Sequence, residues 1–168
     1  MFKSKTVYAI LGAAVGLGFL GHGILGTKTK ESFVELVTGT YDNVLGGTMS
    51  VSTAETWVNI IGWLDIGLAV AFFGLAYAAF SGRDNIAYSP IALGLFGWAI
   101  IWGFLTALSR YTAEDFAGIA IWDVVERGPN YLAPAALVYL IYRQMHATET
   151  AEKAKPTKAV PGAPVPTH

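Results

Sequence analysis

The sequence contains no cysteine and few charged residues. The absence of cysteine excludes disulfides, thiol redox chemistry, zinc–thiolate sites and cysteine-bound iron–sulfur clusters. Charged residues make up 14% of the 168 residues, whereas a soluble domain usually contains about 25%. The apolar residues are grouped in long blocks, and the mean hydropathy is +0.48. This composition indicates a membrane protein.

Two further absences limit the function. The net charge is −1 at pH 7, and the sequence has no basic patch or motif of the kind that binds nucleic acid, so we expect no nucleic-acid partner. A Ser-His-Asp signature and a phosphate-binding loop are also missing. The expected partners are therefore the lipid bilayer and other membrane-protein subunits.

Four apolar stretches are predicted to cross the membrane as helices: residues 7–26, 57–80, 90–109 and 130–145. A helix rises about 1.5 Å per residue against roughly 30 Å of hydrocarbon, so about 20 residues are enough. The alternative for the first stretch is a secretory signal peptide. Its length and the lack of an A-x-A cleavage site favour a retained helix.

The connections and the C-terminal segment complete the predicted fold. Residues 27–56 and 111–128 each contain an amphipathic pattern that predicts a short interfacial helix. The S/T-x-x-E pattern at Ser52–Glu55 predicts a capping box that starts the second membrane helix. We therefore predict an all-α fold: a four-transmembrane-helix bundle in residues 1–146, with two short interfacial helices and a disordered Pro/Ala/Lys-rich tail in residues 147–168.

The distribution of lysine and arginine predicts the orientation. Four crossings put both termini on one side, and this side carries seven of the 11 basic residues. Cytoplasmic loops of membrane proteins carry an excess of basic residues. We therefore expect cytoplasmic N- and C-termini and a location in a prokaryotic inner membrane.

Asp65 is the one charged residue within residues 57–80, and an intramembrane carboxylate is a candidate functional residue. The predicted topology brings it to the same half of the bundle as other polar residues from four segments. The candidate ligand-binding or buried polar residues are His22, Asp65, Trp102, Thr106, Arg110, Glu126, Arg127 and Asn130. Two interpretations stay open: a structural network that pairs Asp65 with His22, Arg110 or Arg127, and a ligand or proton site on the same residues.

The positions of the histidines and carboxylates in the sequence limit which cofactors and metals the protein could bind. A bis-histidine haem on His22 and His146 is excluded because the two residues lie near opposite faces of the membrane. A single-histidine ligand to haem or chlorophyll at His22 is a weaker alternative to a quinone. A metal site of His22, Asp65 and Glu126 has suitable ligand types but no motif spacing, so no metal is expected.

The order of several short motifs resembles a known family. These are Gly21-His22-Gly23, Gly62-Trp63-Leu64-Asp65, the segment from Thr106 to Arg110, and the run from Trp122 to Asn130 followed by Pro134. Together, between Val7 and Arg143, they resemble the DoxX-like family of small four-helix integral membrane proteins. The resemblance implies a four-helix bundle. Some members resemble subunits of a thiosulfate:quinone oxidoreductase or are linked to membrane redox complexes, and many have no known activity.

Two function classes follow from these observations. In the first, the protein is a subunit or accessory component of a membrane redox complex, and its polar cluster binds a lipophilic, quinone-like ligand. In the second, it is a non-catalytic structural or assembly subunit of a larger membrane complex. Because the sequence lacks the cysteines found in some redox-linked members, thiol chemistry does not carry over from the family. No catalytic residue is assigned, and whether the protein is an enzyme stays open.

Overall fold

A computed structural model of the protein describes residues 4–116, 118 and 121–153, and these residues form helices and turns without a strand. Four helices are long and three are short. In chain order they are α1 (Ser4–Thr27), α2 (Glu31–Leu45), α3 (Val51–Phe80), α4 (Asp84–Ala87), α5 (Pro90–Ala113), α6 (Ile121–Glu126) and α7 (Gly128–Lys153).

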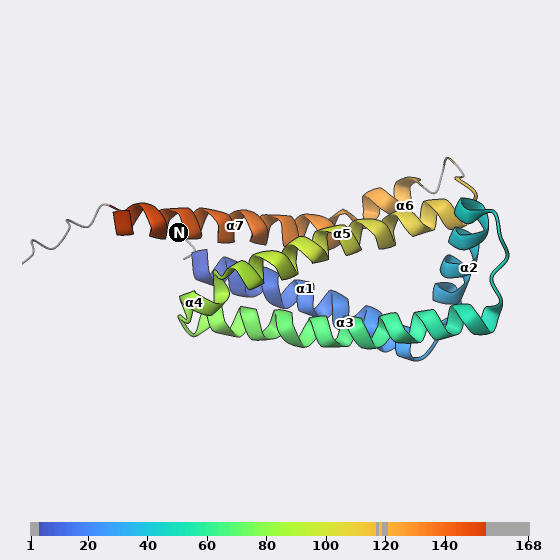
Figure 1. The fold of residues 1–168 in the computed structure, drawn as a ribbon, viewed down its shortest axis with the longest axis horizontal. Coiled ribbons are helices and arrows are strands. Elements are labelled where there is room, and N and C mark those ends of the chain that lie inside the picture. The colour runs from blue at the N-terminus through green and yellow to red at the C-terminus, as the bar shows by residue number, and fades with distance from the viewer. Residues whose placement is uncertain (1–3, 117, 119–120, 154–168) are drawn as a thin grey trace, which may run out of the picture.

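The four long helices run alternately in opposite directions along the long axis of the molecule. Helix α1 lies beside α3, and α5 lies beside α7 (Figure 1). Helix α1 begins and α7 ends at the same end of the molecule, where α4 links α3 to α5; we call this the terminal end. Helices α2 and α6 lie towards the other end, which we call the α2 end.

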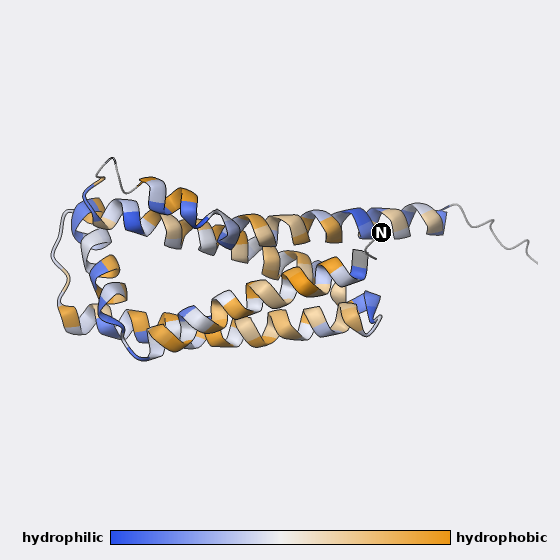
Figure 2. Cartoon of the chain, turned by 180° about the vertical axis from the view of Figure 1, so that it is seen from behind, coloured by the Kyte–Doolittle hydropathy of each residue, from blue (hydrophilic) through white to orange (hydrophobic). Residues whose placement is uncertain are grey.

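Three of the long helices, α1, α3 and α5, are long and apolar enough to cross a membrane, which is the pattern of an integral membrane protein. Their surfaces are mostly apolar, whereas polar residues gather near the two ends of the molecule (Figure 2). Within its described residues, helix α7 is not apolar enough over a sufficient length to count as a membrane-spanning helix. Its apolar stretch is bounded by Asn130 at one end and by Arg143 and Gln144 at the other.

Several helix ends differ from the predictions. Helix α3 begins at Val51, and its cap is Ser50, whose hydroxyl accepts a hydrogen bond of 3.2 Å from the Thr53 amide; the cap predicted at Ser52 was two residues late. The predicted interfacial helix in residues 111–128 is divided, because α5 continues to Ala113 and α6 has only six residues. Helix α7 extends to Lys153, so residues 147–153 are helical where a tail was expected. Residues 154–168 lie outside the described part.

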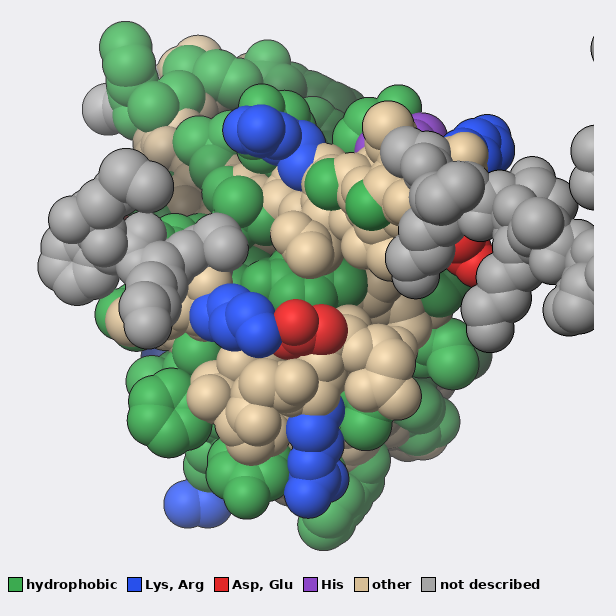
Figure 3. Space-filling model, turned by 90° about the vertical axis from the view of Figure 1, so that its left-hand side faces the viewer, with side chains coloured by type: hydrophobic (Ala, Val, Ile, Leu, Met, Phe, Trp, Pro, Cys, Tyr) green, Lys and Arg blue, Asp and Glu red, His purple; other side chains and the backbone are tan. Residues whose placement is uncertain are grey.

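The terminal half of the bundle is densely packed. Its largest fully buried side chains come from all four long helices: Tyr8, Phe72, Phe96, Leu137 and Ile141. The rings of Phe72 and Phe96 stack with their centres 5.0 Å apart. Two polar side chains here have close partners: the Tyr8 hydroxyl donates to the Ala87 carbonyl at 2.7 Å, and Lys5 binds one carboxylate oxygen of Asp84 at 2.7 Å, whereas the other oxygen of Asp84 is buried without a partner among the described residues. Figure 3 views this end, where basic and acidic side chains lie within a rim of hydrophobic ones.

Helix α2 crosses the ends of α3 and α5 instead of extending away from the bundle (Figure 1). Its first half packs through Val34 on Ala54 and Val58 of α3. Its second half is bonded to the end of α5: the Thr40 hydroxyl donates to the Ser109 carbonyl at 3.1 Å, and the Asn43 amide donates to the Thr112 carbonyl at 2.9 Å. The amphipathic pattern predicted this helix correctly, and the structure places it as a cover over the α2 end.

Candidate functional site

The site begins at a close crossing of α1 and α3. A Cβ atom built on Gly62 would lie 2.5 Å from the Thr27 nitrogen and 2.9 Å from the Gly23 carbonyl oxygen. Only glycine therefore fits at Gly62, and the two backbones touch. Asp65 follows Gly62 by one helical turn and is 4% exposed. The crossing thus brings Asp65 of α3 next to His22 of α1.

A second close crossing joins α5 to α7. A Cβ atom built on Gly103 would lie 2.6 Å from the Asn130 carbonyl oxygen. Pro134 has no N–H group to donate to this oxygen within the helix, so α5 passes α7 where a backbone carbonyl lacks its usual partner. Gly103 follows Trp102 directly, and the crossing brings the Trp102 and Asn130 side chains together.

Between these two helix pairs lie two adjoining cavities that share His22, Asp65, Trp102 and Thr106. The first, of about 170 Å³, is bounded by α1, α3, α5 and the start of α7; we call it the Asn130 chamber. The second, of about 240 Å³, is bounded by α1, α2, α3, α5 and Arg127; we call it the Arg110 chamber. The walls of both are mainly apolar, as in sites for small organic ligands.

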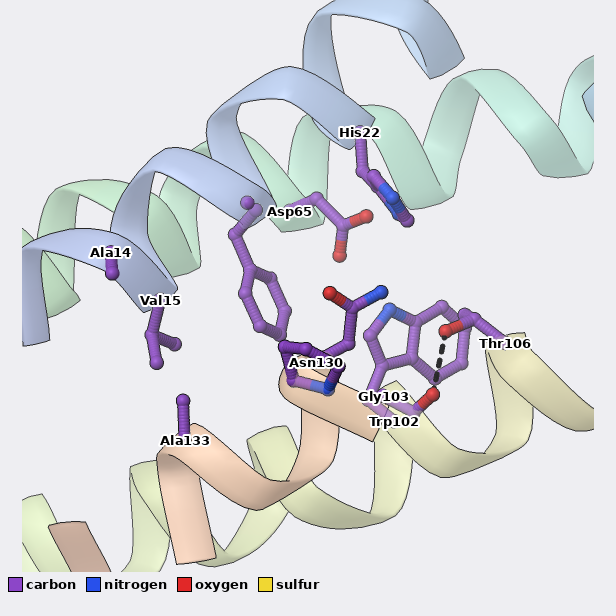
Figure 4. Close-up of a pocket in the computed structure, with 12 residues that line it drawn as sticks. Ala14, Val15, His22, Asp65, Trp102, Gly103, Thr106, Asn130 and Ala133 are labelled. Atoms are coloured by element: carbon purple, nitrogen blue, oxygen red, sulfur yellow. Dashed lines mark hydrogen bonds between the residues drawn. The ribbon is translucent and has the colours of Figure 1, made fainter. Parts of the chain in front are cut away.

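The polar groups of the Asn130 chamber point towards one another. The polar ends of His22, Asp65, Trp102 and Asn130 face one space, the first two from α1 and α3 and the last two from α5 and α7 (Figure 4). The Thr106 hydroxyl donates to the Gly103 carbonyl at 3.1 Å. The Trp102 indole N–H is directed at the Asp65 carboxylate. However, its buried Nε1 atom makes no hydrogen bond within the described part of the chain.

The Arg110 chamber carries the positive charge of the site. Arg110 and Arg127 both line it and are both partly buried. Burial, and then the positive charge of Arg110, lowers the pKa of the Arg127 guanidinium below its ordinary value, and Glu126 and Asp123 oppose this shift. Both arginines also act electrostatically on His22. The two guanidinium groups are therefore close enough to repel each other.

The ion pair expected for Asp65 is not formed. The ion pairs among the described side chains are Lys5–Asp84, His146–Glu149 and Lys153–Glu149, and none involves Asp65, Arg110 or Arg127. The chambers separate the carboxylate from the guanidinium groups. The physical reason lies in the backbone: α2 and the two close crossings determine the helix positions, and the charged side chains do not draw the helices together.

The structure gathers seven of the eight residues proposed from the sequence around the two chambers. His22, Asp65, Trp102 and Thr106 line both, Asn130 lines the first, and Arg110 and Arg127 line the second. Glu126 lines neither chamber and is exposed. Glu126 ends the short helix α6 and Arg127 follows it, so the two side chains point in different directions, and only the arginine lines a chamber.

Among the described side chains, no group of three or more His, Asp or Glu residues lies close enough together to hold a metal ion. His146 lies near the polar end of α7, with its ring 4.2 Å from that of Tyr142 and its Nδ1 atom 3.7 Å from Glu149. His22 instead packs on Phe33 of α2, with ring centres 5.7 Å apart. The two histidines thus belong to different parts of the bundle.

The sequence reasoning missed the residues that shape the chambers. Gly103 was not among the residues selected from the sequence, and Phe33, Leu36 and Val37 belong to the helix that was predicted within residues 27–56 to lie at the membrane interface, whereas they form a wall of the Arg110 chamber. A signal was present for Gly103, because it directly follows a tryptophan already singled out.

Comparison with known proteins provides no relative. No family model, no curated protein and no solved structure matches the chain. The resemblance to the DoxX-like family stays a prediction, and function is argued from the two chambers.

Proposed function

We propose that the protein is an integral membrane protein that binds a lipophilic, quinone-like ligand in the Asn130 chamber, as a subunit or accessory component of a membrane redox complex. The chamber supports the ligand part of this proposal. The resemblance of the short motifs to the DoxX-like family supports the redox part.

The observation that carries the proposal is the Trp102 indole N–H. It is buried and faces a cavity, and it points towards the Asp65 carboxylate without making a hydrogen bond to it. A buried polar group without a partner costs about 1–3 kcal/mol. A ligand carbonyl oxygen in the chamber would accept this N–H and remove that cost.

The remaining lining residues suit the rest of such a ligand. Val15, Phe19 and Ala133 offer apolar contacts for a ring or an isoprenoid chain. Asp65 and His22 stand beside the same space and are the side chains able to exchange a proton with a ligand oxygen. The amide of Asn130 adds a second donor on the opposite side of the chamber.

The proposal includes a membrane arrangement. Helix α7 forms the fourth crossing, the terminal end faces the cytoplasm, and the α2 end faces the outside of a prokaryotic inner membrane. The alternating directions of the four long helices and the basic residues near the terminal end support it. A topology reporter fused after the C-terminus should be active only in the cytoplasm, and one inserted at Gly46 only outside; the opposite pattern contradicts the orientation.

The ligand proposal is tested by titrating the purified protein in nanodiscs with a short-chain benzoquinone. Trp102→Phe keeps the ring and removes the N–H, so the Kd should rise roughly two- to tenfold, the effect of one neutral hydrogen bond. Trp63→Phe is the matched control, because Trp63 is 63% exposed on the outer face of α3, and its Kd should equal that of the wild type.

A negative result has a defined meaning. If the wild type shows no saturable binding, or if Trp102→Phe and Trp63→Phe bind alike, the chamber is not a quinone site. Purification in mild detergent then tests the non-catalytic alternative, in which the wild type and Trp102→Phe should both retain the same protein subunits.

A further inference from the structure

Two arginines from separate segments meet at the α2 end of the bundle. Arg110 lies in the last turn of α5, and Arg127 lies between α6 and α7. Both line the Arg110 chamber, and the positive charge of Arg110 adds to the lowering of the Arg127 pKa. Like charges held together in a partly buried cavity destabilise an empty site.

No described carboxylate forms an ion pair with either arginine, although Glu126 and Asp123 act on Arg127 from outside the chamber. Neither guanidinium makes a hydrogen bond or an ion pair with a described residue, although the three ion pairs found elsewhere show that the charged side chains can pair. Asp65 is the one carboxylate among the lining residues of the chamber, and it is turned towards Trp102. The chamber therefore holds excess positive charge and several unused N–H donors.

The other walls of the chamber are apolar and come from three helices. Phe33, Leu36 and Val37 of α2 face Val58 and Ile61 of α3 and Leu105 of α5. Helix α2 is held in this position by its hydrogen bonds to Ser109 and Thr112 at the end of α5. The chamber thus combines a cationic end with an apolar wall, at the level where α3 and α5 reach the end of the bundle.

We propose that Arg110 and Arg127 bind a phosphate-class oxyanion, carried by the headgroup of an anionic membrane lipid whose apolar part lies along the α2 wall of the Arg110 chamber. Guanidinium groups donate paired N–H bonds that match phosphate oxygens. A phosphate between the two arginines neutralises their repulsion and uses their free donors. The apolar wall favours a lipid over a free ion. This inference does not depend on quinone binding in the Asn130 chamber.

Thermal unfolding in detergent with added lipid tests the proposal. Phosphatidylglycerol should raise the melting temperature of the wild type more than the same amount of phosphatidylcholine, which has no net charge. Arg110→Gln and Arg127→Gln should each weaken the phosphatidylglycerol response roughly tenfold in lipid concentration, as expected for losing a charged hydrogen-bond donor. Arg143→Gln is the matched control, since Arg143 is an exposed arginine on α7 that lies over Tyr139, and its response should equal that of the wild type.

A second arm uses inorganic phosphate without lipid. A response to phosphatidylglycerol alone assigns the site to a lipid headgroup, whereas an equal, arginine-dependent response to inorganic phosphate keeps the oxyanion site and assigns it to a free ion. The proposal is overturned if phosphatidylglycerol and phosphatidylcholine act alike, or if both arginine variants keep the full response.

The melting temperatures of the arginine variants without added anion distinguish a loss of anion binding from a loss of stability. Arg110→Gln removes the repulsion with Arg127, so without anion it should melt no lower than the wild type. A fall in melting temperature that is equal with and without phosphatidylglycerol would show a purely structural arginine and overturn the proposal. Because these measurements contain no quinone, their failure leaves the Trp102 test unaffected.

Discussion

The terminal half of the bundle and the chamber half are built from the same four long helices but differ in how they pack their polar groups, although, among the described residues, each has one buried polar atom without a partner, Asp84 Oδ1 and Trp102 Nε1. In the terminal half, the Tyr8 hydroxyl and the Lys5 ammonium find partners at 2.7 Å, and aromatic rings fill the space between the helices. In the chamber half, the indole of Trp102 and the two arginines face open space. The terminal half thus pairs its buried hydroxyl and ammonium groups with partners inside the protein.

The difference in packing between the two halves supports the proposed ligand site in the chamber half. Protein interiors are normally packed like organic crystals, and the aromatic core of the terminal half follows this rule, although an open groove of about 690 Å³ runs beside it between α4 and the end of α7. Stability alone gives no reason to keep two adjoining cavities lined by unpaired donors, since such groups destabilise the folded state. We infer that the terminal half holds the helices together and that the chamber half is shaped for something that enters it.

The largest expected effect belongs to the packed half. Phe72→Ala removes a ring with no exposed surface that contacts both Phe19 and Phe96, and the cavity left behind should lower the free energy of unfolding by about 3–5 kcal/mol. Phe80→Ala, on the same helix, removes a ring that is 78% exposed and should cost less than about 1 kcal/mol. Unfolding of both variants in a detergent series measures the difference; similar costs would contradict a packed terminal half.

A smaller effect is expected at the crossing that positions Asp65. Gly62→Ala places a Cβ atom 2.5 Å from the Thr27 nitrogen, and because backbone must move, the cost should be about 1–3 kcal/mol. At Gly67, also on α3, a Cβ atom meets nothing within 4 Å. Gly67→Ala should therefore leave the free energy of unfolding unchanged or raise it by up to about 1 kcal/mol.

The same unfolding assay ranks these two alanine variants. An equal loss in both would mean that alanine acts through the helix itself and not through the contact between α1 and α3. Loss of benzoquinone binding in Gly62→Ala alone would link the crossing to the chamber, because this crossing places His22 beside Asp65.

The sequence predicted the long helices well because their signal is local. Apolar length determines α1, α3 and α5, and Pro90 after Ser89 begins α5 as expected, with the Ser89 hydroxyl accepting from the Ala92 amide at 3.1 Å. Helix ends were less predictable. The sequences around Ser50 and Ser52 offer competing caps, and the end of α7 has no glycine or proline before residue 153 to stop it.

The residues that line the site could be predicted from the sequence, whereas the contacts between their side chains could not. Polar residues in apolar helices stand out in a sequence, which is why Asp65, Trp102 and Arg127 could be selected. Whether they pair depends on distances between helices, and these are determined by glycines such as Gly62 and Gly103 that carry no chemical signal of their own. A sequence therefore suggests an ion pair for Asp65 wherever charges share one end of a bundle, although here the chambers keep them apart.

The smallest effect on stability should come from filling the hollow half. Gly18 lines the Asn130 chamber, and a Cβ atom there meets nothing within 4 Å. Gly18→Leu should therefore not lower the free energy of unfolding, because its side chain enters empty space, and should raise it by at most about 1 kcal/mol, as for Gly67→Ala. The same side chain occupies much of a chamber of about 170 Å³, so the binding of a short-chain benzoquinone should be abolished.

Gly21→Leu is the matched control for this variant. Gly21 lies one turn further along α1, a Cβ atom there also meets nothing within 4 Å, and Gly21 lines neither chamber. Its benzoquinone affinity should equal that of the wild type, and its melting temperature should match that of Gly18→Leu. If Gly18→Leu instead loses as much stability as Gly62→Ala, the Asn130 chamber is closed in the membrane, and the contrast between the two halves of the bundle does not hold.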